Sequence, residues 1–146
     1  INGGQHADTT IKMGHLGPAC ASSQKYRGVI DDQARAVFQG KIQVSRPAQK
    51  TDGCQSHHAL LLSEEAQVSA KPELDIQADD VTCRHGAAAG QADKDALFYM
   101  NARGIPHAQA MALLVRSFIG AAIEGVTLPC MREALGRKID KWLDER

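Results

Sequence analysis

A thiol and an imidazole lie two residues apart at Cys83 and His85, where a β-type pattern gives way to a helical one. Residues i and i+2 of a strand point to the same side, so the two side chains are expected to share a face. Thiolate and imidazole are good ligands for iron and zinc, but two ligands are too few for a closed tetrahedral site. A second subunit or external sulfide would have to complete it. The alternative is structural, with Cys83 filling the interior and His85 hydrogen-bonded at a strand end.

A second Cys/His group consists of Cys54 with His57 and His58. Adjacent residues of a strand face opposite sides, so at most one of the two histidines can share a site with Cys54. We interpret Cys54 as an incidental thiol, with an accessory metal contact as the alternative. Cys20 and Cys130 have no nearby base or partner, and the sequence contains no C-x-x-C pair. We therefore expect four reduced thiols rather than two disulfides.

The composition argues against several functional classes. Lys and Arg together number 17, as do Asp and Glu, so the formal net charge is zero. A neutral chain is not expected to bind nucleic acid or a membrane surface through bulk charge. No apolar run approaches the ~20 residues of a membrane span, and no secretory signal opens the chain, which predicts a cytoplasmic protein. Nucleotide-binding, serine-hydrolase and zinc-protease motifs are missing as well.

The elements that must position Cys83 and His85 are short apolar runs separated by Gly, Pro, Asp and Ser. These runs favour strands of up to about eight residues rather than amphipathic helices. Apolar positions recur in steps of 19 or 20, as from Ile11 to Ile30, which suits one coil of a β-solenoid. A β-sandwich with turns roughly every 8–12 residues is the alternative. The candidate strands are 9–13, 26–30, 36–38, 41–44, 59–62, 67–70, 73–76 and 81–83.

Three helices are expected in the last third of the chain. Asp93 can cap the first, which should end before Gly104, a residue that tolerates the left-handed conformation at a helix end. Pro106 can open a second helix over 107–126, and Pro129 a third. The second helix is apolar around much of its circumference, whereas the third has one apolar stripe above a charged face.

These elements predict a mainly β domain over 1–90 and a helical domain over 91–146. The chain begins with Ile1 rather than Met, so we expect the β domain to be truncated on its N-terminal side. The apolar circumference of the second helix, which includes Met111, Val115, Phe118 and Ile119, indicates contact on more than one side. Packing within the chain can account for it.

Four motifs of the chain are specific when taken together: Ala78–Ala87, Leu97–Ile105, Leu60–Glu64 and Lys71–Leu74. They resemble the C-terminal portion of the SufD members of the SufB/SufD family, which assemble iron–sulfur clusters. The resemblance runs from about Ile11 into the helical tail, and it implies a right-handed parallel β-helix followed by about three helices. It also implies that His85 lies at the junction with SufB and takes part in forming a nascent cluster.

The resemblance implies a non-catalytic scaffold subunit of a SufBCD-type complex. Its β-helix would pair with SufB, and its helices would dock the SufC ATPase, with Met111, Val115, Phe118 and Ile119 as the expected partner-binding residues. A homodimer would be possible in isolation. No tightly bound cofactor is expected; iron or an iron–sulfur cluster would be held transiently at the SufB interface by His85 and Cys83. A solenoid enzyme (a polysaccharide lyase or an acyltransferase) and a small Cys/His metal-binding protein are the alternatives. The sequence shows neither a groove of clustered charged residues nor the hexapeptide repeats that such enzymes need.

Overall fold

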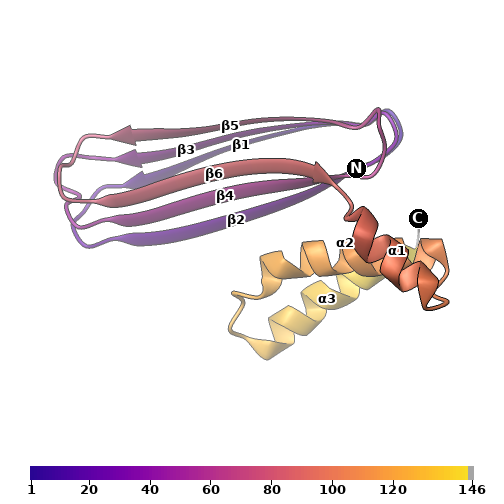
Figure 1. Cartoon of the computed structure of the whole chain (residues 1–146). Helices are drawn as coiled ribbons and strands as arrows, with labels where there is room; N and C mark the ends of the chain where they lie inside the picture. The colour runs from indigo at the N-terminus through magenta and orange to yellow at the C-terminus, as the bar shows by residue number, and fades with distance from the viewer. Residues whose placement is uncertain (145–146) are drawn as a thin grey trace.

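The structure, a computed structural model, describes residues 1–144, which form six β-strands followed by three α-helices (Figure 1). The strands are β1 (His6–His15), β2 (Ala21–Ile30), β3 (Arg35–Val44), β4 (Asp52–Leu61), β5 (Gln67–Ile76) and β6 (Thr82–Gln91). The helices are α1 (Lys94–Ala102), α2 (His107–Ile123) and α3 (Pro129–Asp144). The prediction of a mainly β chain with a helical C-terminal module is confirmed. None of the helices in this part of the chain is long and apolar enough to cross a membrane.

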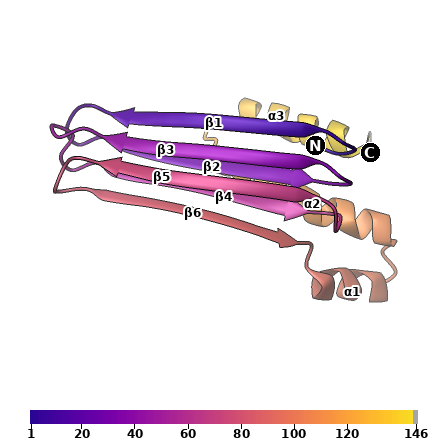
Figure 2. The ribbon, with the colours of Figure 1, turned by 90° about the horizontal axis from the view of Figure 1, so that it is seen from above.

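Successive strands alternate between two parallel sheets. One sheet has the order β1-β3-β5 and the other the order β2-β4-β6. Figure 1 shows the sheets as two layers, with the helices below the layer that contains β2, β4 and β6. Viewed from above, β1 and β6 lie at opposite rims of the stack (Figure 2). Because the strands of each sheet are parallel and in register, side chains of paired residues form rows that run across the sheet.

The spacing of paired residues differs from the predicted repeat. Ile11 pairs with Gly40, whereas Ile30 lies in the opposite sheet. The 19-residue step therefore links apolar positions of the two sheets, and it is wrong as the distance between stacked residues. The paired residues are 29 to 32 positions apart, as the first pair of each register shows: His6 with Arg35, Ala21 with Asp52, Arg35 with Gln67, and Asp52 with Thr82.

Each strand has ten residues, which is longer than the predicted runs. Two pairs of predicted short strands are joined into β3 and β5. The interruptions in their apolar patterns fall on Gly40 and Pro72, which are register partners. Gly40 leaves space for a side chain from the opposite sheet, and Pro72 lies on a strand with one neighbour, where a missing N–H is tolerated.

Inward-facing side chains fill the space between the sheets in two apolar clusters with a polar stretch between them. Gln24, Gln55 and His57 form this polar stretch and are buried. The apolar clusters hold the two ends of the strands together through the hydrophobic effect. Their buried members are Ile30, Ala34, Ala59 and Ala66 at one end, and Ile42, Val44, Ala48 and Ala78 at the other.

The helix boundaries follow largely from local sequence. Asp93 caps α1 as predicted, and its carboxylate accepts two backbone N–H groups of the first turn at 2.9 and 3.0 Å. Gly104 follows the helix with a φ of +84°, the left-handed conformation expected there. α2 ends at Ile123 rather than at the predicted Val126, because Gly125 is a poor helix former.

α2 joins the helical module to the outer face of the β2-β4-β6 sheet. Val115 is 1% exposed and packs against Val29 and Leu60. The change from strand to helix lies between Gln91 and Lys94. The division into two domains stays a prediction, and the range predicted for the second domain extends past the described residues.

Candidate functional site

β6 is the last strand of its sheet and pairs on one side only, with β4. β5 is likewise the last strand of the other sheet, after β3. Both strands lie at the same rim of the stack (Figure 2). Within residues 1–144 they therefore present backbone N–H and C=O groups without a strand partner. The two predicted metal ligands, Cys83 and His85, lie in β6 and hence at this rim.

Cys83 and His85 project to the inner side of the stack. Their register partners, Gly53 and Gln55, are buried, and side chains of paired residues point to the same side of a sheet. Because no strand follows β6 in the described chain, this side is open at the rim, and His85 is exposed. The two side chains share a face, whereas their binding of a metal stays a prediction.

The two side chains differ in accessibility. Cys83 is half-buried and packs against the apolar cluster that contains Ile42. Its Sγ lies 3.3 Å from the position that a Cβ would take on Gly53. The thiol is therefore directed partly into the interior, and His85 is the more accessible of the two candidate ligands.

The chain contributes a limited number of ligands at this rim. No group of three or more His, Cys, Asp or Glu side chains in residues 1–144 could hold a metal ion. Arg84, between the two candidate ligands, projects to the other side of β6 and pairs with Asp52 at 3.3 Å. A closed site at Cys83 and His85 would thus need ligands from another molecule.

Cys54 and His57 do not share a site, because they lie on opposite faces of β4. The His57 ring is stacked on Phe38, with the ring centroids 4.4 Å apart and an interplanar angle of 13°. Burial lowers the pKa of His57, and the neighbouring His58 lowers it further. His57 is therefore a neutral core residue at ordinary pH.

Two buried glutamines were missed by the sequence reasoning. Gln24 and Gln55 are 9% and 1% exposed, and they are register partners on β2 and β4. The Gln55 Nε2 donates a hydrogen bond to the Gln24 Oε1 at 2.9 Å. His85 is the next residue of the same row. The signal for this row is the spacing of paired residues, which the 19-residue step did not reveal.

The predicted partner-binding residues of α2 pack within the chain. Val115 belongs to the buried part of the cluster between α2 and the sheet, and Met111, Phe118 and Ile119 are its partly buried neighbours. The guanidinium of Arg27, from β2, lies 4.9 Å from the centre of the Phe118 ring. The apolar girth of α2 is thus explained by its contacts with the sheet and with α3, while binding of a partner by these residues stays a prediction.

Other apolar side chains of the helical module are exposed. A groove of about 330 Å³ between α2 and α3 is lined almost entirely by apolar atoms, with Ile119 and Leu135 on its two sides. Exposed apolar side chains near one another are typical of a surface that binds another protein. Those of the helical module, including the α2–α3 connection, are Phe98, Tyr99, Leu113, Leu128, Met131 and Leu135.

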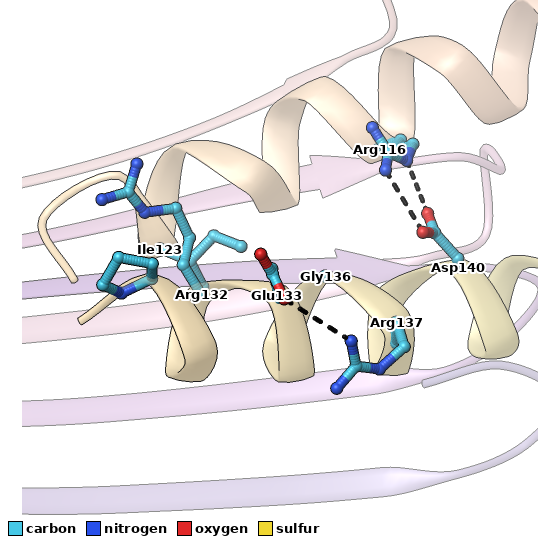
Figure 3. Close-up of a pocket in the computed structure, with 8 residues that line it drawn as sticks. Arg116, Ile123, Arg132, Glu133, Gly136, Arg137 and Asp140 are labelled. Carbon is cyan, nitrogen blue, oxygen red and sulfur yellow. Dashed lines mark hydrogen bonds and ion pairs between the residues drawn. The ribbon is translucent and has the colours of Figure 1, made fainter. Parts of the chain in front are cut away.

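A second pocket between α2 and α3, of about 530 Å³, is lined by charged residues (Figure 3). Arg116 donates two hydrogen bonds to the carboxylate of Asp140, at 2.5 and 3.2 Å, and these bonds lower the pKa of Asp140. Arg137 lies 3.9 Å from Glu133, and Arg132 donates to a backbone carbonyl. Each charged group that lines this pocket has a partner, and the Arg116–Asp140 pair joins α2 to α3.

The sequence of this chain is similar to those of known proteins. The family profile described as "SUF system FeS cluster assembly, SufBD core domain" matches residues 1–118. The chain is 38% identical over 92% of its length to an iron–sulfur cluster assembly SufBD family protein of Synechocystis sp.. It is 38% identical over 82% of its length to SufD of Escherichia coli, and 31% identical over 95% to SufD of Bacillus subtilis. It spans 30%, 28% and 32% of the lengths of these three relatives.

Residues 1–118, which contain the six strands, α1 and the first part of α2, thus match proteins of iron–sulfur cluster assembly. The chain belongs to the SufB/SufD family, and the resemblance seen in the sequence is confirmed.

Proposed function

We propose that this chain is part of a non-catalytic scaffold subunit of a SufBCD-type complex. In this proposal a SufB-like subunit pairs with the β stack and a SufC-like ATPase binds the helical module. The observation that carries the proposal is the coincidence of two features at one rim: both sheets end there, and His85 is exposed there. Its cytoplasmic location stays a prediction from the sequence.

The proposal includes the form of the β stack. Strands that alternate between two parallel sheets, with partners 29 to 32 residues apart, are what coils of a parallel β-helix produce. We propose a right-handed β-helix, since crossovers between parallel strands are nearly always right-handed. Each coil would then contain one strand of each sheet.

The proposed SufB-like contact is strand pairing along β5 and β6. A partner strand can add to an edge strand through backbone hydrogen bonds, as in β-augmentation. The segment 86–90 of β6 consists of glycine and alanine, and its residues are exposed. Small side chains let another backbone approach closely. The same rim could pair two copies of this chain when no SufB-like subunit is present.

At the paired rim, His85 and Cys83 would contribute ligands to a nascent cluster, which is the cargo of the complex and not a resident cofactor. His85 is the main candidate because its ring is accessible, whereas the Cys83 thiol is directed partly inward. The partner subunit and sulfide would supply the remaining ligands.

The ATPase contact is proposed on the exposed apolar surface of α2 and α3. Ile119, one of the predicted residues, lines the apolar groove of this surface but also supports the cluster on the sheet. Leu128, Met131 and Leu135 are exposed and so can be replaced with little effect on the fold. We therefore extend the proposed partner surface to Leu128, just before α3, and to Met131 and Leu135 of α3.

The test is co-purification with SufB-like and SufC-like proteins from the same source, with iron and sulfide assayed on the complex. We expect His85→Ala to keep both partners but to reduce the cluster yield at least tenfold. His6→Ala, at an exposed position of β1, is the matched control and should change neither. A normal cluster yield with His85→Ala would remove this residue from the mechanism. Failure of the unaltered chain to bind either partner would contradict the scaffold role.

A further inference from the structure

The row of inward side chains that ends at His85 begins with two amides. Gln24 on β2, Gln55 on β4 and His85 on β6 are consecutive register partners, so they lie on one line across the sheet. Neighbouring strands are about 4.8 Å apart, a distance over which glutamine side chains form hydrogen-bonded ladders. The first step of such a ladder is present between Gln55 and Gln24, at 2.9 Å.

The direction of this bond orients the Gln55 amide. Its Nε2 faces Gln24 on β2, and the two polar atoms of an amide lie on different sides of Cδ. The Oε1 therefore does not face Gln24. It lies against Gly40 of the opposite sheet, and β6 is the strand next to β4 on the side away from β2. This oxygen is buried and accepts no hydrogen bond from any group in residues 1–144. A buried acceptor without a donor is costly, so a donor at the next residue of the row would be favourable.

The Gln55 amide is packed against the opposite sheet. A Cβ on Gly40 of β3 would lie 2.1 Å from the Gln55 Oε1. The amide therefore rests on the backbone of β3, and Gln55 itself is only 1% exposed. Its position is fixed by packing, which is what a residue that orients another side chain requires.

We propose that Gln55 is a positioning residue for His85: its Oε1 accepts the N–H of the His85 ring and holds the ring in one tautomer. A neutral imidazole has one N–H donor and one acceptor nitrogen, so fixing the donor fixes the acceptor. The other ring nitrogen is then available at the open rim as a ligand. Oriented histidine ligands commonly donate their second nitrogen in this way. This inference rests on the proposed function of His85 for its biological meaning, but its geometry can be tested separately.

The test is nitrogen NMR of the histidine rings in the 146-residue chain, at a pH of about 9, well above the ordinary histidine pKa. The unaltered chain should show one predominant His85 tautomer. Gln55→Leu, which removes the acceptor but keeps the volume, should give a mixture of both. Gln55→Glu should restore one tautomer, because a carboxylate can accept the same hydrogen bond from His85. The Gln24 Nε2 donates no hydrogen bond within residues 1–144, so the Gln24 amide can turn to donate to this carboxylate.

Gln55→Asn tests whether the length of the side chain matters, because it keeps the amide but is one methylene shorter. Its amide should not reach His85, so this variant should give the same mixture of tautomers as Gln55→Leu. The His57 ring signals report whether each variant keeps the fold. If Gln55→Leu does not fold, the proposal is tested by comparing Gln55→Glu, which should show one His85 tautomer, with Gln55→Asn, which should show a mixture. One tautomer ratio throughout the folded variants would overturn the proposal. A changed ratio together with a normal cluster yield from His85→Ala would support the positioning role and contradict the proposed function instead.

Discussion

At the scale of single residues, the middle of the space between the two sheets is polar, whereas the two ends of the strands are packed with apolar side chains. The buried His57 ring is stacked on Phe38, and its Nδ1 has no hydrogen-bond partner in residues 1–144. Such a residue can stay buried only in its neutral form. This gives the fold a dependence on pH that the sequence did not indicate.

We expect the unfolding free energy to fall as the pH drops below about 6.5, the ordinary pKa of histidine. The pKa of His57 is lowered in the folded state, so the unfolded chain binds the proton first. The contribution is complete above the unfolded pKa and is lost as the pH falls through the folded pKa. Urea unfolding between about pH 5 and pH 8 measures it.

Two variants test whether His57 causes this pH dependence of the unfolding free energy. His57→Phe keeps a ring against Phe38 and should make the unfolding free energy less dependent on pH. His6→Gln, at an exposed position, should leave the dependence as it is. If both variants retain the same pH profile as the unaltered chain, another group is responsible.

Gly40 provides a second prediction at this scale. Gly40→Ala should destabilise the fold by about 1–3 kcal/mol, because its Cβ would overlap the Gln55 Oε1 at 2.1 Å. Gly14→Ala is the matched control, since a Cβ on this strand glycine meets nothing within 4 Å. Urea unfolding gives both values. Adding Gln55→Ala to Gly40→Ala should remove the overlap; a strictly additive double variant would show that the two residues do not interact.

At the scale of elements, the helical module is attached to the β stack mainly through α2. Val115→Ala should lower the unfolding free energy by about 2 kcal/mol, because it removes two buried methyl groups from contact with Val29 and Leu60. Leu113→Ala, on the 46% exposed side chain of the same helix, should change it by less than about 0.5 kcal/mol. Equal effects of the two variants would mean that α2 does not pack on the sheet in solution.

At the scale of the whole molecule, the proposed function depends on the free edge of β6. The backbone N–H of Thr82 donates to Thr51, next to β4, at 2.8 Å. Alternate residues of a parallel strand direct their backbone groups to the same neighbour, so Ala88 faces β4 and Ala87 faces the rim. A proline at each position therefore removes a donor from a different partner.

We expect Ala87→Pro to fold like the unaltered chain but to lose the SufB-like partner in co-purification. Ala88→Pro should instead lower the unfolding free energy by at least about 1 kcal/mol, because a bond to β4 is lost. Circular dichroism on urea titration separates the two effects. Undiminished partner binding by a folded Ala87→Pro chain would place the subunit interface away from β6.

Where the chemistry is local, the sequence was sufficient. Asp93 and Gly104 mark the ends of α1 because a carboxylate and a residue without Cβ satisfy helix ends by themselves. The β character of the first part and the position of Cys83 and His85 in one strand also followed from residue types and spacing. The family followed from motifs that the comparisons bear out.

Only the tertiary structure decided which residues meet. A strand in this stack pairs with residues about thirty positions away, so no local pattern shows that Gln24, Gln55 and His85 form one row. The same limit applies to α2. The sequence does not distinguish an apolar residue that contacts a partner from one, such as Val115, that packs against a sheet of its own chain. Local residue types determine where helices and strands form. Which face of each element is buried depends on the segments from elsewhere in the chain that pack against it.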